Sequence, residues 1–181
     1  MSKISGLYRR NAELNQITTE SITEALLILM IDYKYEEISV SAICEKAGVS
    51  RNAFYKNFGT KDNVFKSVVT TFNKQLLKKV GNPFNKRVHV GWYVNFFELV
   101  KENYKLYELV INSGFQNTYL EYVNKLLTNS SNLDAKTKYN RLLWNGAIQN
   151  TVIDWIKHGM KETPTEMAKI CYPKLKVFKI K

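Results

Sequence analysis

Basic side chains alternate with aromatic ones between residues 46 and 61. The basic residues are Lys46, Arg51, Lys56 and Lys61, and the segment contains no acidic residue. Lysine and arginine neutralise phosphates, and large aromatic side chains can anchor the helix that presents them. This combination indicates a surface for a polyanion such as nucleic acid. From these residues alone, an ordinary solvated pair of surface helices is the alternative.

Two short helices joined by a tight turn would present these side chains. Ser41 is expected to cap the first helix, because a serine hydroxyl accepts an N–H that the first turn leaves unpaired. Gly48 tolerates the left-handed backbone of the turn, and Ser50 is expected to cap a second helix over residues 51–57. The pattern predicts a helix-turn-helix, whose second helix enters the major groove of DNA.

The second helix has two faces. Phe54 and Phe58 are four residues apart, so they share one face and are expected to anchor the helix to the core. The residues around the remainder of the helix can meet a polyanion, and these are Arg51, Asn52, Tyr55 and Lys56.

The segments on either side are also predicted to be helical. Residues 18–33 carry apolar side chains at helical spacing, and residues 61–80 keep the same rhythm behind a cap at Thr60. Residues 84–181 read as helical throughout, and Pro164 marks the first turn of the last helix. We therefore expect an all-α fold.

Two domains and an arm are expected from this pattern. Residues 1–17 are polar and weakly patterned, which predicts a flexible N-terminal arm. Residues 18–62 would form the three-helix domain, and residues 63–181 a helical bundle with regulatory and dimerisation roles. The helix over 61–80 would connect the two domains.

Composition limits the class of protein. The chain has 181 residues, 45% of them hydrophobic, which is enough to bury a core. Its net charge of +11 favours anionic partners. Cys44 and Cys171 are expected to be structural thiols, and the lack of a disulfide framework fits a reducing cytoplasm. We expect no secretory signal and no membrane-spanning helix.

The sequence gives little support for catalysis. His89 and His158 lie in different predicted helices, with no partner residues at a catalytic spacing. We find no glycine-rich phosphate loop, no metal-binding spacing of cysteine and histidine, and no nucleophile motif. We therefore expect neither an enzyme nor a bound metal or cofactor.

Residues 38–50, which read ISVSAICEKAGVS, resemble the N-terminal domain of TetR-type transcriptional repressors. The resemblance continues through Phe54-Tyr55, Phe58, Thr60-Lys61-Asp62 and Phe65. It covers residues 18–65 densely. Asn57 stands where the family most often has histidine, and Lys34 stands where it often has glycine.

The resemblance implies a role for individual residues on DNA. Ser41, Tyr55 and Lys61 would contact phosphates. Asn57 is a further candidate for a phosphate contact, although it replaces the usual histidine of the family. The residues that would face the groove are Arg51, Asn52, Ala53 and Lys56, and Ser50 joins the set at the start of the helix. The bacterial cytoplasm is the location that the family implies.

Aromatic residues are abundant in the C-terminal half. A filled core and a small-molecule pocket both explain them, because helix bundles bind ligands between their helices. The resemblance implies an inducer pocket in this half, and its expected ligand is a small hydrophobic or aromatic molecule. The candidate lining residues are Trp92, Tyr93, Phe96, Tyr107, Phe115, Tyr119, Tyr122 and Trp144.

The resemblance also implies a homodimer, in which the last two helices of each subunit form a four-helix interface. The candidate interface residues are Leu142, Ile148, Val152, Trp155, Ile156, Met167 and Ile170. The two recognition helices of a dimer would match a palindromic operator. The expected function is a DNA-binding, ligand-responsive transcriptional repressor.

Two alternatives are open at this point. The bundle could dock a protein partner, which would make the chain an activator or a coactivator-docking regulator. The chain could instead be a basic protein of membrane surfaces that uses its tail. Residues 174–181 of that tail alternate basic and apolar side chains, which predicts an extended or frayed segment. Pro173 is expected to kink or end the last helix.

Overall fold

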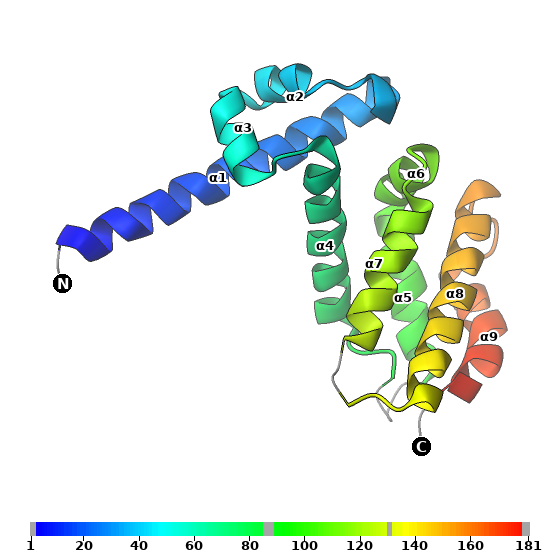
Figure 1. Cartoon of the computed structure of the whole chain (residues 1–181). Coiled ribbons are helices and arrows are strands. Elements are labelled where there is room, and N and C mark those ends of the chain that lie inside the picture. The colour runs from blue at the N-terminus through cyan, green and yellow to red at the C-terminus, as the bar shows by residue number, and fades with distance from the viewer. Residues whose placement is uncertain (1–2, 85–88, 130–131, 179–181) are drawn as a thin grey trace. The chain divides into compact units, whose positions relative to one another are not determined.

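A computed structural model describes residues 3–84, 89–129 and 132–178, without the side chains of residues 3–10. In these segments every regular element is a helix, which confirms the all-α prediction. The chain divides into two compact units, Met1–Thr70 and Thr71–Lys181. The division lies between Thr70 and Thr71, eight residues after the predicted one between 62 and 63 and inside the same helix over 61–80. Figure 1 shows the succession of helices along the chain.

The first unit is a helix-turn-helix packed on a long helix. Helix α1 spans Lys3–Asp32, α2 spans Val40–Ala47 and α3 spans Arg51–Asn57. A 3-10 turn, η1 (Tyr35–Glu37), precedes α2, and α4 (Lys61–Val80) begins in this unit. Both α2 and α3 pack against α1 (Figure 1). Ile22, Leu26, Ile43, Phe54 and Val64 are completely buried and form the core.

The helix α1 begins much earlier than the sequence predicted. We expected its start at Thr18, after an arm, whereas the structure places it at Lys3. Residues 11–17 are all exposed. A helical segment that packs against nothing needs no regular spacing of apolar residues, so the sequence carries no helical signal there. Adding a residue to an existing helix is easier than nucleating one, so the packed part can extend into a polar segment. The expected arm is therefore helical from Lys3.

Serine residues cap both helices of the motif, although one cap differs from the prediction. Ser39, and not Ser41, caps α2, because its hydroxyl accepts the N–H of Ala42 at 3.1 Å. Ser50 caps α3 as predicted and accepts from Ala53 at 3.2 Å. Gly48 has φ 65°, which confirms its place in the left-handed turn.

The second unit is a bundle of helices that follows the second half of α4. Its core includes Tyr93, Phe97, Val100, Ile148 and Val152, each almost fully buried. Within it α5 packs along α9, and α7 packs along α8. The bounds of these helices are Val90–Glu102 for α5, Tyr104–Asn112 for α6, Gln116–Thr128 for α7, Ala135–Lys157 for α8 and Pro164–Leu175 for α9.

The last helix passes through its internal proline. The predicted cap is confirmed, because Thr163 and Glu166 form a reciprocal capping box with Pro164 in the first turn. The sequence predicted that Pro173 kinks or ends the helix. It does not end it, since α9 runs to Leu175 and the 3-10 turn η2 (Lys176–Phe178) follows. Cys171 and Leu175 are buried on either side of the proline, and this packing outweighs one lost backbone bond. The expected extended tail is thus helical as far as residue 178.

The two cysteines are divided between the units. Cys44 is buried in the first unit and Cys171 in the second, and both are free thiols. Burial raises the pKa of the Cys44 thiol, and it raises the pKa of Cys171 to about 11. Both side chains are therefore protonated packing residues at neutral pH, as expected.

Replacing Tyr93 with phenylalanine should make the free energy of unfolding less sensitive to alkaline pH. Burial raises the pKa of Tyr93 from 10.0 to about 12, so the folded chain keeps a phenol proton that the unfolded chain loses. This stabilisation is full below pH 10.0 and is lost as the pH rises toward the folded pKa of about 12.

Denaturant titrations below and above pH 10.0 would test this expectation. The Tyr93→Phe variant also loses the bond that Trp144 Nε1 donates to the Tyr93 hydroxyl at 3.0 Å, which lowers stability at every pH. The relevant readout is therefore the change with pH. An identical loss of stability in both proteins would contradict the prediction.

Candidate nucleic-acid interface and ligand cavities

The short helix α3 presents polar side chains because an aromatic residue fixes its other face. Phe54 is 0% exposed, and its ring packs edge-on against Tyr55 at 5.6 Å between centroids and obliquely against Phe58 at 6.3 Å. This confirms the predicted anchoring role of Phe54. The residues left exposed on α3 are those expected from the sequence, namely Arg51, Asn52, Tyr55 and Lys56.

Two predicted DNA-contacting residues are joined in the protein alone. Arg51 donates a hydrogen bond from Nη2 to the hydroxyl of Ser41, and this bond links the start of α3 to the first turn of α2. Both residues are exposed. The guanidinium retains further N–H groups, so it can bind an additional acceptor without leaving Ser41.

Asn57 is directed toward the inside of the unit. Its amide donates to the carbonyl of Ala53 at 2.8 Å, and its carbonyl accepts from the hydroxyl of Thr19 on α1 at 3.4 Å. Ala53 and Asn57 are both half-buried. These bonds tie the end of α3 to α1, so the structure does not group Asn57 with the exposed side chains of α3.

Lys61 is engaged in contacts that the sequence did not reveal. Its ammonium donates to the backbone carbonyls of Tyr35 and Ile38, the second at 2.7 Å, and lies 4.2 Å from the centre of the Tyr35 ring. The Tyr35 hydroxyl donates to Asp62 at 2.6 Å. Burial, followed by Asp62, raises the pKa of Tyr35 well above its usual value. The first turn of α4 therefore holds the loop that leads into α2.

Tyr35, Ser39 and Asp62 are thus positioning residues that sequence reasoning missed. Ser39 could have been found as a serine followed directly by the apolar start of a helix. Tyr35 and Asp62 pair across 27 residues, and no local pattern reports such a bond. Their joint effect is to fix the entry to α2 relative to α3.

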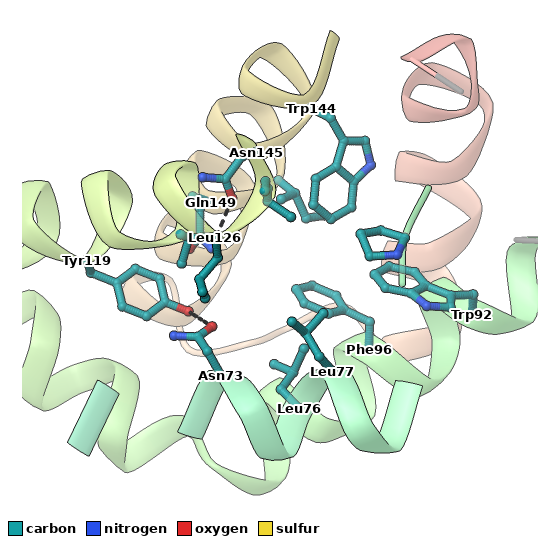
Figure 2. A pocket seen from close by; sticks show the side chains of 14 residues that line it. Asn73, Leu76, Leu77, Trp92, Phe96, Tyr119, Leu126, Trp144, Asn145 and Gln149 are labelled. Carbon is teal, nitrogen blue, oxygen red and sulfur yellow. Dashed lines mark hydrogen bonds between the residues drawn. The ribbon is translucent and has the colours of Figure 1, made fainter. Parts of the chain in front are cut away.

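The second unit contains two cavities with different sizes. One of about 40 Å³ lies between α4, α5, α7 and α8, and Trp92, Phe96, Tyr119 and Trp144 of the predicted pocket residues line it (Figure 2). The other, of about 410 Å³, lies between α6, α7 and α8 and is lined by Tyr107 and Tyr119. The remaining candidates, Tyr93, Phe115 and Tyr122, line neither cavity.

Neutral polar side chains accompany these aromatic residues. The Tyr119 hydroxyl donates to Asn73 of α4 at 3.2 Å, as Figure 2 shows, and it is also bonded to Tyr107 and Gln149. Asn145 is completely buried and donates to Asn124 at 2.9 Å. The sequence analysis considered only aromatic residues and missed Asn73, Asn145 and Gln149, because asparagine and glutamine on a helix usually face water.

Comparison with known proteins decides the family. Residues 22–68 match the family described as "Bacterial regulatory proteins, tetR family", and residues 91–173 match a "Transcriptional regulator C-terminal region". The chain belongs to the TetR family. Its first unit is thus a TetR-family DNA-binding domain, and the suspected resemblance is confirmed. No curated protein matches the sequence.

Solved structures of TetR-family regulators share the fold. A tetR-family transcriptional regulator from Streptomyces coelicolor is 16% identical, with a TM-score of 0.57, and the match covers 88% of this chain and 81% of that one. The fatty acid degradation regulator FadR from Bacillus halodurans is 20% identical, with a TM-score of 0.54, over 87% and 93% of the two chains. The dihydroxyacetone kinase operon activator DhaS is 19% identical, with a TM-score of 0.54, over 88% and 94%.

Most of the predicted interface residues of this TetR-family chain are buried within its own second unit. They are Ile148, Val152, Trp155, Ile156 and Met167. Their helical spacing marks packing inside the bundle, so these side chains are not exposed on the single chain, and their place in a subunit interface stays a prediction. Leu142 is half-buried, and only Ile170 is well exposed, at 58%.

A different apolar surface lies on the same two helices. Tyr139 and Leu143 are exposed one turn apart on α8, and Ile170 and Val177 are exposed on α9 and the turn that follows it. We call these four residues the α8–α9 surface. In the described part of the chain, no three histidine, cysteine or acidic side chains cluster as metal ligands. None of the described helices is long and apolar enough to cross a membrane.

Replacing Lys61 with alanine should destabilise the DNA-binding unit. The carbonyls of Tyr35 and Ile38 would lose a charged donor, and a bond of this kind contributes roughly 1–3 kcal/mol. Denaturant unfolding of Lys61→Ala and of Lys66→Ala would measure the effect, since Lys66 is an exposed lysine on the same helix. Equal stability of the two variants would show that the Lys61 contacts contribute nothing specific.

Proposed function

We propose that this TetR-family regulator is a transcriptional repressor that binds a palindromic operator as a homodimer and releases it when a small molecule binds the second unit. The observation that carries the DNA part is the exposed face of α3, which holds Arg51, Asn52, Tyr55 and Lys56 on a helix fixed by Phe54. Each proposed role follows from the chemistry of its side chain. The proposed location is the bacterial cytoplasm.

Contacts with phosphates would position the protein, and contacts with bases would select the sequence. We assign Tyr55 and Ser41 to phosphates, together with the third N–H of Lys61, whose other two are bonded inside the unit. Arg51 has the planar donors that suit a guanine edge, and Asn52, Ala53 and Lys56 would approach neighbouring bases. Ser50 and Asn57 stay in the proposed set of DNA-contacting residues because they hold the two ends of α3. Ser50 caps its start, and Asn57 ties its end to α1.

The proposed ligand response depends on α4. This helix starts at Lys61, beside the loop that leads into α2, and ends at Val80 in the second unit. Its residue Asn73 is bonded to Tyr119 at the wall of both cavities. A ligand that prefers one position of α4 would shift the population of the DNA-binding state.

A protein partner in place of a small molecule is the alternative for the regulation. It would make the chain an activator or a coactivator-docking regulator, and DhaS is described as the activator of an operon. The cavity of about 410 Å³ lies within the ordinary size range of small-molecule sites, and it favours the small ligand.

The dimer would form through the α8–α9 surface. Exposed apolar side chains on two adjacent helices are the usual material of such an interface, and four helices would meet across it. A two-fold symmetric dimer would place two recognition helices about 34 Å apart, one helical turn of DNA, and its symmetry would be mirrored by a palindromic operator.

Replacing Arg51 with alanine should weaken operator binding by about 1–3 kcal/mol and relax the preference at one base pair. The operator is first located by footprinting DNA upstream of the gene itself and of its neighbours. Fluorescence anisotropy then compares operator with random DNA. Ser41→Ala is the comparison variant, because it breaks the bond between the two residues and leaves the guanidinium in place. Since Ser41 is assigned to a phosphate, this variant should weaken binding to both DNAs alike. A uniform loss on both DNAs in Arg51→Ala would remove Arg51 from the base-reading role.

Replacing Leu143 with glutamate should convert the dimer to a monomer, because a charge would then lie in the apolar α8–α9 surface. Sedimentation velocity at micromolar concentration measures the change. Ile31→Glu is the control, since Ile31 is also exposed, at 72%, but belongs to α1. A dimer that persists in the Leu143 variant would locate the interface elsewhere.

A further inference from the structure

Among the residues that the structure describes, no charged side chain lines either of these two cavities of the second unit. The larger one has Tyr107, Val110, Ile111, Gln116, Asn117, Tyr119, Leu120, Gly146, Gln149, Asn150 and Ile153 at its wall. The smaller one shares Tyr119 and Gln149 and adds mainly apolar side chains. No lysine, arginine or histidine belongs to either lining, although the whole chain carries a net charge of +11.

The polar atoms in these linings are amides and phenols. Burial raises the pKa of Tyr107 and of Tyr119, so both hydroxyls stay protonated and uncharged at neutral pH. Tyr119 is bonded to Asn73, Tyr107 and Gln149, and both Tyr119 and Gln149 belong to the linings of the larger and the smaller cavity. A ligand in the larger cavity would meet donors and acceptors but no opposite charge.

The first turn of α7 borders the larger cavity as well. Gln116 and Asn117 belong to this turn, and the Phe115 side chain does not cap it. Backbone N–H groups of such a turn suit an oxygen acceptor, and they carry only a partial positive charge. A carbonyl or hydroxyl oxygen is satisfied there, whereas a carboxylate or phosphate would also need a full counter-charge to offset its loss of water.

We propose that the cavity of about 410 Å³ binds an uncharged ligand that has an apolar body and an amide, carbonyl or hydroxyl group, and that it discriminates against carboxylates and phosphates. This proposal rests on the proposed ligand response. The apolar wall of Val110, Ile111, Leu120 and Ile153 would cover the apolar body, and Gln149, Asn150 and the first turn of α7 would bind the polar group. Tyr119 lines this cavity and is bonded to Asn73 of α4, so a bound ligand would contact a residue that is hydrogen-bonded to α4.

A pair of probes that differ only in charge tests the discrimination. 2-Naphthamide and 2-naphthoate have the same ring system and nearly the same shape, and at neutral pH only the second is an anion. Isothermal titration calorimetry with the full chain should show that the amide binds at least about tenfold more tightly. Equal or tighter binding of the carboxylate would overturn the proposal, since the helix terminus would then decide the preference.

A charge added at the cavity wall should reverse the preference. Asn150 is exposed and lines the larger cavity, so Asn150→Lys can be tolerated and would supply the missing cation. We expect this variant to bind 2-naphthoate about tenfold more tightly than the unmodified chain does. Asn132→Lys is the matched control, because it makes the same change at an exposed residue outside both linings. An equal gain in the control would assign the effect to net charge and count against the site.

Operator binding measured on the same samples separates this inference from the proposed function. If neither probe binds while the operator does, the inferred ligand class is wrong and the DNA-binding function stands. If 2-naphthamide binds with the expected preference but leaves operator affinity unchanged, the ligand class is supported and the proposed release of DNA fails.

Discussion

The burial of Phe54 is the constraint on which the DNA-facing surface depends. Helix α3 has only seven residues, too few to be stable alone in water. The ring of Phe54 is buried, and the Ser50 hydroxyl caps α3 by accepting one of the unpaired N–H groups of its first turn. Once that face is fixed, the angular position of Arg51, Asn52, Tyr55 and Lys56 around the helix follows. The identity of these four side chains can then vary without any change in the fold.

Different polar groups are held around helix α4 in the two units. The DNA-binding unit keeps cations at its surface, and where it takes one inward, at Lys61, two carbonyls and the face of Tyr35 surround the ammonium. The second unit buries Asn73 and Asn145 together with Tyr93, Tyr107 and Tyr119, all of them uncharged, and it also holds Arg141, which donates to the carbonyl of Leu127. Helix α4 belongs to both arrangements, since Lys61 and Asp62 lie at one end of it and Asn73 lies further along. Its first turn and its middle are therefore held by different kinds of bond.

Local features of the sequence predicted local features of the structure. Gly48, Ser50, Thr60 and the Thr163–Pro164 start all act within a few residues, and each adopts the predicted role. Ser39 and Ser41 are two residues apart and chemically identical, so the pattern could not decide which one caps α2. The role of Lys61 depends on Tyr35, far away along the chain. Apolar spacing on α8 showed that Ile148 and Val152 are buried, but such spacing cannot distinguish burial inside a subunit from burial between subunits. The DNA-contact assignments, the ligand and the dimer remain predictions.

The distribution of the cysteines gives each unit a built-in chemical reporter. Cys44 and Cys171 are both buried, and burial raises both pKa values, so a thiol reagent in solution meets little reactive thiolate while the protein is folded. Each thiol becomes reactive only when its own unit opens. The rates of labelling at the two sites therefore measure the opening of the two units separately, without any engineered label. A difference between those rates would show which unit opens first.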